Sequence, residues 1–202
     1  MKRLLLCAAI VTAFFLTASC LPGGSSGDEG TNNGSNGTSD TRSTGGGDSP
    51  SFPVENDCPN GPLSEPIDGC APDPLPSTGD PRVDCVRRIN QLRGECQCLP
   101  PLERWSEGEQ CADEQAAYDA ENDSPHAGFS ENICSPRGSA QNECPGYNSW
   151  DHVIGTCLQQ MWNEGPGEPF SEHGHYINMT NPDYNKVACG SGDGWYVQNF
   201  SP

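Results

Sequence analysis

A carboxylate and two histidines with metal-binding or proton-transfer chemistry lie close together in the last quarter of this sequence. Glu164, His173 and His175 fall between an amphipathic run over residues 150–162 and a turn signal at 181–183. Imidazole nitrogens bind Zn²⁺ and similar ions, and a nearby carboxylate can orient a bound water or accept a proton. This stretch is therefore the first candidate for a functional site.

The elements that position these residues can be predicted from the pattern of apolar side chains. Residues 150–162 carry apolar side chains at the spacing of one buried helix face, and Gly165-Pro166-Gly167 is typical of a helix end. The helix would place the carboxylate at its end. His173 and His175 are then expected in a polar loop, followed by a strand at Tyr176-Ile177-Asn178.

These motifs resemble the CAP superfamily, which comprises the cysteine-rich secretory proteins, antigen 5 and pathogenesis-related 1 relatives, with a module also called the SCP domain. The matching segments occur in the order of the family: Ile89–Arg93, Leu99–Trp105, Ser130-Glu131-Asn132-Ile133, Trp162-Asn163-Glu164, Gly174-His175-Tyr176, Val187–Gly190 and Val197–Pro202. No single motif is specific, but their order makes a chance match improbable.

The resemblance implies a cleft tetrad of His126, Glu131, Glu164 and His175. His126 and His175 would hold Zn²⁺ or another divalent metal, and the carboxylates would orient water or the histidines. The alternative is a hydrogen-bond network that pins helix to sheet without any ligand. His152 is expected to be solvated.

An α+β fold is predicted for the C-terminal part of the chain. Helical patterns near 83–93 and 106–121 precede short strand patterns at 186–190 and 195–200, without regular alternation. Ser106 and Glu109 are expected to form a capping box. The resemblance implies a three-layer α-β-α sandwich with a small, mostly antiparallel sheet, here disulfide-rich.

The chain divides into four segments by composition. Residues 1–19 read as a signal peptide, 20–52 as a flexible Gly/Ser/Asn tether, 53–81 as a Pro-rich collar with cysteines, and 82–202 as the CAP/SCP-like domain. Cys20 follows Ala-Ser and is expected to be lipidated, as in a bacterial lipoprotein; ordinary signal cleavage nearby is the alternative. The protein is thus expected to be exported, as a cell-surface or outer-membrane lipoprotein or a secreted protein.

The cysteine count supports export. Once Cys7 and Cys20 are set aside, ten of the twelve cysteines remain, which predicts five disulfides of unspecified connectivity. The competing interpretation is a zinc-thiolate site at Cys96 and Cys98, whose spacing is too tight for the usual motifs. The predicted disulfide cysteines are Cys58, Cys70, Cys85, Cys96, Cys98, Cys111, Cys134, Cys144, Cys157 and Cys189.

The net charge and the absence of common catalytic motifs limit the classes of function that this sequence indicates. A formal net charge of −18 makes nucleic acid an improbable partner. There is no G-x-S-x-G or H-E-x-x-H motif, and every mature cysteine is better used in a disulfide. The sequence therefore favours a binding module for a lipid, sterol, glycan or protein, with a membrane contact through the lipid anchor. The alternative is a metal-dependent, peptidase-like hydrolase that uses the same cleft, and a third is a purely structural surface protein.

Overall fold

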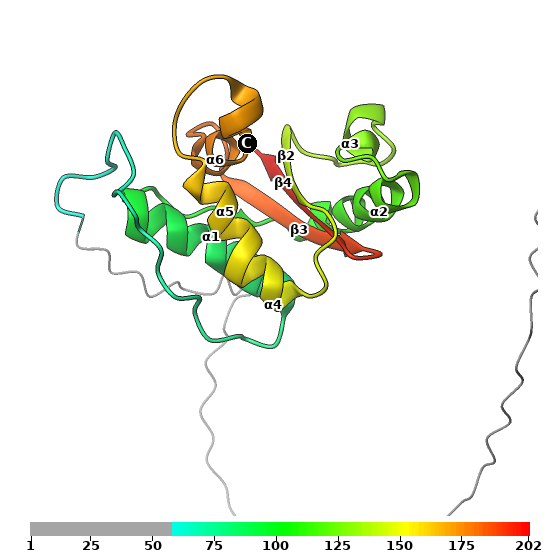
Figure 1. Ribbon diagram of the computed structural model, residues 1–202, viewed down its shortest axis with the longest axis horizontal. Coiled ribbons are helices and arrows are strands. Elements are labelled where there is room, and N and C mark those ends of the chain that lie inside the picture. Colours follow the sequence, from blue (N-terminus) through cyan, green and yellow to red (C-terminus); the bar gives the residue numbers. More distant parts are fainter. Residues whose placement is uncertain (1–57) are drawn as a thin grey trace, which may run out of the picture. The chain divides into compact units, whose positions relative to one another are not determined.

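The computed structural model describes residues 58–202, which are coloured in Figure 1. The signal peptide, Cys20, the tether and the first residues of the collar lie outside the described residues, so these remain predictions. Within residues 58–202, no helix combines the length and the apolar character needed to cross a membrane.

A four-stranded mixed sheet forms the centre of the domain. Its order is β1-β3-β4-β2, from Glu103–Arg104, Lys186–Gly192, Trp195–Ser201 and Ala140–Cys144. β3 and β4 form an antiparallel hairpin, β2 pairs antiparallel with β4, and β1 pairs parallel with β3. The predicted mostly antiparallel sheet is confirmed.

Helix α2, Ser106–Asn122, covers one face of this sheet, with the short helix α3, Ala127–Glu131, beside it (Figure 1). The close approach depends on glycine. A Cβ at Gly190 would lie 2.5 Å from the backbone of Ala112 and Asp113, and one at Gly192 would lie 2.5 Å from the backbone N of Ala117. The strand and helix backbones therefore touch where the two glycines lie.

The remaining helices lie on the other side of the sheet (Figure 1). They are α1, Pro81–Gln97; α4, Trp150–His152; a π-helical turn, Val153–Cys157; α5, Leu158–Asn163; and α6, Phe170–Thr180. Their apolar faces meet in one core that includes Ile89, Leu92, Leu158, Met179 and Phe200, all fully buried. The predicted three-layer α-β-α arrangement is thus confirmed.

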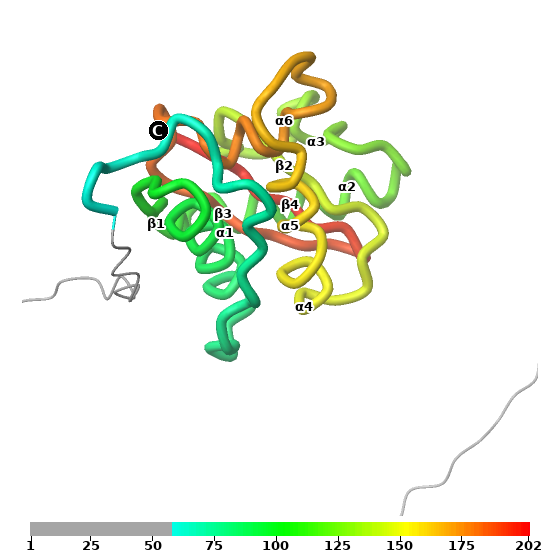
Figure 2. The backbone as a smooth tube through the Cα atoms, turned by 60° about the vertical axis from the view of Figure 1, so that its left-hand side comes forward, coloured from blue at the N-terminus to red at the C-terminus, as the bar shows by residue number. Residues whose placement is uncertain are grey.

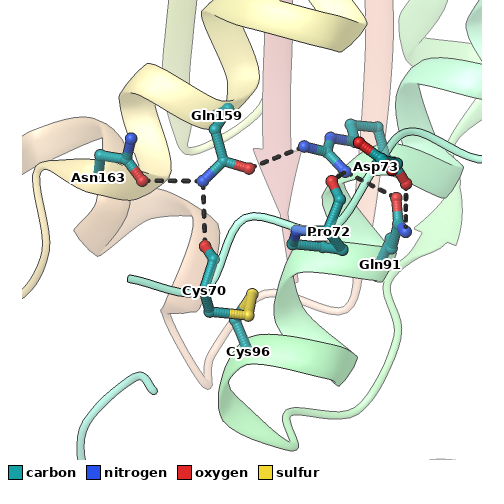
Figure 3. Close-up of a disulfide and its surroundings, with 8 residues drawn as sticks. Cys70, Pro72, Asp73, Gln91, Cys96, Gln159 and Asn163 are labelled. Atoms are coloured by element: carbon teal, nitrogen blue, oxygen red, sulfur yellow. Dashed lines mark hydrogen bonds between the residues drawn. A yellow bond between two sulfur atoms is a disulfide. The ribbon is translucent and has the colours of Figure 1, made fainter. Parts of the chain in front are cut away.

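The collar runs along α1 (Figure 2). Two disulfides, Cys58–Cys98 and Cys70–Cys96, join it to the end of that helix. Beside the second disulfide, the Gln159 side chain donates to the Cys70 carbonyl at 3.2 Å and accepts from Arg88 at 2.8 Å (Figure 3). A segment too rich in proline for helix or central strand is thereby held by covalent bonds and side-chain amides.

The other three disulfides cross-link the layers. Cys85–Cys189 joins α1 to β3, Cys111–Cys134 joins α2 to the segment after α3, and Cys144–Cys157 joins β2 to the π-helical turn. All ten predicted cysteines are paired. Cys96 and Cys98 bond to different collar cysteines, so they do not form a zinc-thiolate pair.

Two local predictions are wrong. Residues 170–180 form α6 instead of a loop and a strand, because Tyr176 and Met179, three positions apart, are buried on one helix face.

The predicted capping box of Ser106 and Glu109 at the start of α2 is absent. Trp105 is the N-cap without a side-chain bond, and Glu109 instead accepts from Arg104 at 2.5 and 3.0 Å. The buried carboxylate of Glu109 therefore pairs with Arg104 and does not cap the helix.

Candidate functional site

Both predicted metal-binding histidines line one cavity, of about 170 Å³. His126 directly precedes α3, whereas His175 lies on α6. Gln141 of β2 and Phe170, Ser171 and Asn178 of α6 also line the cavity. The side chains of His126 and His175 are 40% and 35% exposed, so a ligand can reach both rings from solvent.

Glu164 holds the His175 ring from the end of α5. Its Oε1 lies 2.5 Å from His175 Nδ1, and its Oε2 accepts the backbone N–H of His175 at 3.0 Å. A carboxylate oxygen accepts, so Nδ1 of His175 is the donor of this hydrogen bond and Nε2 is left for another partner. The predicted partnership of Glu164 and His175 is therefore a carboxylate–imidazole hydrogen bond.

Gln141 holds the His126 ring in the same way. Its Oε1 lies 2.7 Å from His126 Nδ1, while its Nε2 donates to Gln115 Oε1 at 3.0 Å and to Asn199 Oδ1 at 3.3 Å. In this arrangement the amide oxygen of Gln141 faces the histidine. With that oxygen as the acceptor, Nδ1 of His126 is the donor, and Nε2 is left for another partner.

A buried acid lies behind His126. Glu143 of β2 is 4% exposed, and its Oε2 accepts the backbone N–H of His126 at 2.8 Å. Its Oε1 has no partner, and neither does Oδ2 of the fully buried Asp119. Burial raises the pKa of the Glu143 carboxyl to about 8, the His126 N–H bond opposes the rise, and the neighbouring Asp119 carboxylate adds to it. A protonated Glu143 would satisfy this pocket best.

Glu131 differs from the prediction. It ends α3 with an exposed side chain that accepts the hydroxyl of Tyr118 at 2.7 Å, and it does not line the cavity. Asn132, in a left-handed conformation, ends the helix directly after it. The structure therefore brings together His126, Glu164 and His175, and it places Glu143 beside His126 where Glu131 was expected.

The other two histidines have local roles. His173 lies on α6 and its Nδ1 donates to the carbonyls of Glu164 and Gly165 at 2.8 and 3.0 Å, which satisfies the C-terminus of α5. His152 contacts Asn148 and the ring of Tyr147 at the surface, as expected of a solvated residue. Neither lines the cavity.

The donor set suits a metal only in part. A histidine that binds zinc through one nitrogen usually donates the other to a carboxylate or carbonyl oxygen, and both rings satisfy this condition. Within residues 58–202, however, no group of three or more His, Cys, Asp or Glu side chains is arranged to hold an ion. His126 and His175 would supply two ligands, one fewer than the three protein ligands usual at a zinc site with an open position, and a bound ligand or water would fill the others.

Sequence reasoning missed Gln141 and Phe170, which line the cleft, and Glu143, which lies behind His126. Gln141 and Glu143 are two positions apart on β2 and therefore point to the same face of the sheet, but three consecutive polar residues, Gln141 to Glu143, give no alternation that would have marked a strand. Phe170 is 56% exposed at the start of α6, an unusual position for a large apolar side chain. Recognising α6 as a helix would have placed it one turn from Gly174.

The model of the cysteine-rich secretory protein family, CAP, matches residues 86–200. This span runs from α1 to the last strand and contains all the cleft residues. No curated protein and no solved structure gives a significant match.

Proposed function

Because this chain belongs to the cysteine-rich secretory protein (CAP) family, we propose that its domain is a binding module whose cleft holds a small polar ligand, and that His126 and His175 would hold a divalent metal such as Zn²⁺. One observation carries the proposal. Both rings have Nδ1 engaged, by Gln141 and by Glu164, so Nε2 is the nitrogen that each ring has left to bind a metal. When bound, the metal would supply a positive charge for an anionic or strongly polar ligand group.

The size and polarity of the cavity limit the ligand. Drug-sized molecules occupy pockets of roughly 300–1,000 Å³, and 170 Å³ is well below that range. Five of the seven lining residues carry an imidazole, amide or hydroxyl group. A carboxylate, a phosphate or part of a sugar fits these dimensions, whereas a sterol or a whole acyl chain does not. The exposed ring of Phe170 would contact the part of a larger ligand that stays outside the cavity.

The hydrolase alternative is the weaker of the two. A general base must be free to take a proton from water. Glu164 is engaged by the His175 ring and by the backbone N–H groups of His175 and Tyr176. Glu143 is buried and tied to the backbone of His126. Neither carboxylate is available without breaking the arrangement that holds the histidines.

Calorimetric titration of the purified domain with ZnCl₂ tests the proposal. Wild type should bind one ion, and His126→Ala and His175→Ala should each weaken binding at least tenfold. His152→Ala is the matched control, because it removes an exposed imidazole outside the cavity. An equal loss of zinc affinity in all three variants, or no zinc binding by wild type, would refute the metal site. Peptidase activity that EDTA abolishes would favour the hydrolase.

Five disulfides in a CAP domain are consistent with an extracellular or secreted protein. We further propose that Cys20 is acylated and that the tether holds the domain off a membrane surface. Cys20→Ser should then move the protein from the membrane fraction to the soluble fraction. Wild type found only in the soluble fraction would exclude the anchor.

A further inference from the structure

A second and larger depression, of about 590 Å³, lies on the α2 side of the sheet. Its apolar lining residues are Tyr118, Ile133, Trp195 and two alanines of α2. Its acidic lining residues are Glu114, Glu121 and Asp193. We call this depression the aromatic groove. It shares no lining residue with the histidine cleft, so a ligand bound here would occupy a separate site from the one proposed for that cleft.

The walls of the aromatic groove are fixed before any ligand binds. Gly192 brings the β3–β4 hairpin onto the backbone of Ala117, beside the turn that carries Asp193. The disulfide Cys111–Cys134 ties the segment with Ile133 to α2. The Tyr118 hydroxyl is bonded to Glu131 at 2.7 Å, which orients its ring. A rigid site loses little entropy on binding, which favours affinity.

The charge around the aromatic groove is uncompensated. Between residues 58 and 202, every arginine and lysine contacts protein groups, and none lines the groove. Arg82, Arg87 and Arg104 pair with carboxylates, Arg88 and Arg93 bond to backbone carbonyls, Arg137 lies over Phe129, and Lys186 lies over Trp105. With Glu131 next to Tyr118, four carboxylates surround two aromatic rings. Such a surface attracts cations from solution and holds them over a ring face.

We propose that the aromatic groove binds a basic segment of a partner protein, with an arginine or lysine side chain lying over Trp195 and Tyr118 and paired with Asp193 and Glu121. Aromatic rings attract guanidinium and ammonium groups through their faces, and arginine also stacks on them. The groove is open and exceeds the volume of a single side chain, so it accommodates neighbouring residues of an extended peptide as well. A net charge of −18 would speed the encounter with a basic partner.

Fluorescence anisotropy with a labelled decapeptide of alternating arginine and glycine tests this inference. Saturable binding is expected at low salt, and Trp195→Leu and Asp193→Asn should each weaken it by roughly twofold to thirtyfold. Asp193 has a left-handed backbone conformation that asparagine also tolerates, so this variant should stay folded. Glu107→Gln is the matched control: it removes one charge from the exposed first turn of α2, outside the groove.

Three results would overturn the proposal. The first is no binding at low salt. The second is a loss of peptide affinity in Glu107→Gln as large as that in Asp193→Asn, because binding would then depend on the overall charge of the protein and not on the groove. The third is Trp195-dependent binding of phosphatidylcholine vesicles with none of the peptide, which would make the ligand a lipid headgroup. If Trp195→Leu fails to fold, the comparison of Asp193→Asn with Glu107→Gln decides the question.

Discussion

The contact between α2 and β3 makes Gly190→Ala a strongly destabilising change. A Cβ at this position would lie 2.5 Å from the carbonyl carbon of Ala112 and 2.5 Å from the backbone N of Asp113. Ordinary contacts of a Cβ with other heavy atoms are 3.4–4 Å. Both neighbours are backbone atoms, so no side-chain rotation can relieve the clash. The helix and the strand would have to separate by about 1 Å.

The cost follows from the packing of this layer. Extra methylene groups in a well-packed core typically cost about 1–3 kcal/mol, and a clash with backbone on both sides should reach the upper end. Domains of this size lose roughly 3–5 °C of melting temperature for each kcal/mol. We therefore expect Gly190→Ala to lower the melting temperature by about 10 °C.

Differential scanning calorimetry measures this shift, with Gly155→Ala as the control. Gly155 lies in the π-helical turn, and a Cβ there would meet nothing within 4 Å. Alanine is also preferred to glycine in helical segments, so the control should be neutral or slightly stabilising. Equal melting temperatures for Gly190→Ala and wild type would show that the helix does not touch the strand as described.

Two further predictions concern titration and cross-linking. Because the pKa of Glu143 is about 8 in the folded protein against an ordinary 4.5, the folded state binds the extra proton. The resulting contribution to the free energy of unfolding is complete below pH 4.5 and is lost as the pH rises through 8, with about 1 kcal/mol left at pH 7. Urea unfolding of Glu143→Gln should show no such dependence on pH. A pH profile of Glu143→Gln identical to that of wild type would contradict this assignment of the proton to Glu143. Removing the disulfide Cys85–Cys189, whose cysteines are 104 positions apart, should cost about 4–5 kcal/mol, against about 3 kcal/mol for Cys144–Cys157 at 13 positions. The opposite order in urea unfolding of the double alanine variants would contradict this account of the cross-links.

The sequence predicted those parts of the fold that depend on local pattern. The helix over 150–162, its glycine-proline end and the final hairpin all carry strong periodic or turn signals, and the structure has them, with one π-helical turn. Helix α6 was missed because Gly174, flanked by two histidines, resembles a loop. Only the burial of Tyr176 and Met179 against the core makes the segment helical.

Local motifs and the family resemblance located the histidines of the cleft but not their surroundings. Glu164 and His175 belong to short motifs and contact each other directly, whereas His126 was placed only through the tetrad that the family resemblance implies. Gln141 and Glu143 reach the site through β2, whose register with β4 is a long-range property. Glu131 was predicted from its motif to lie in the cleft, but its carboxylate instead accepts a hydrogen bond from Tyr118 on α2, outside the cleft.

The most direct test of the histidine cleft is the ¹⁵N NMR spectrum of the imidazoles, recorded with and without ZnCl₂. The chain has four histidines, so each ring can be assigned by single substitution. We predict that His126 and His175 both carry their proton on Nδ1 without metal, and that zinc shifts the Nε2 signals of both while His152 and His173 stay unchanged. Protonation on Nε2 in either cleft histidine, or a zinc response at neither, would contradict the proposed site.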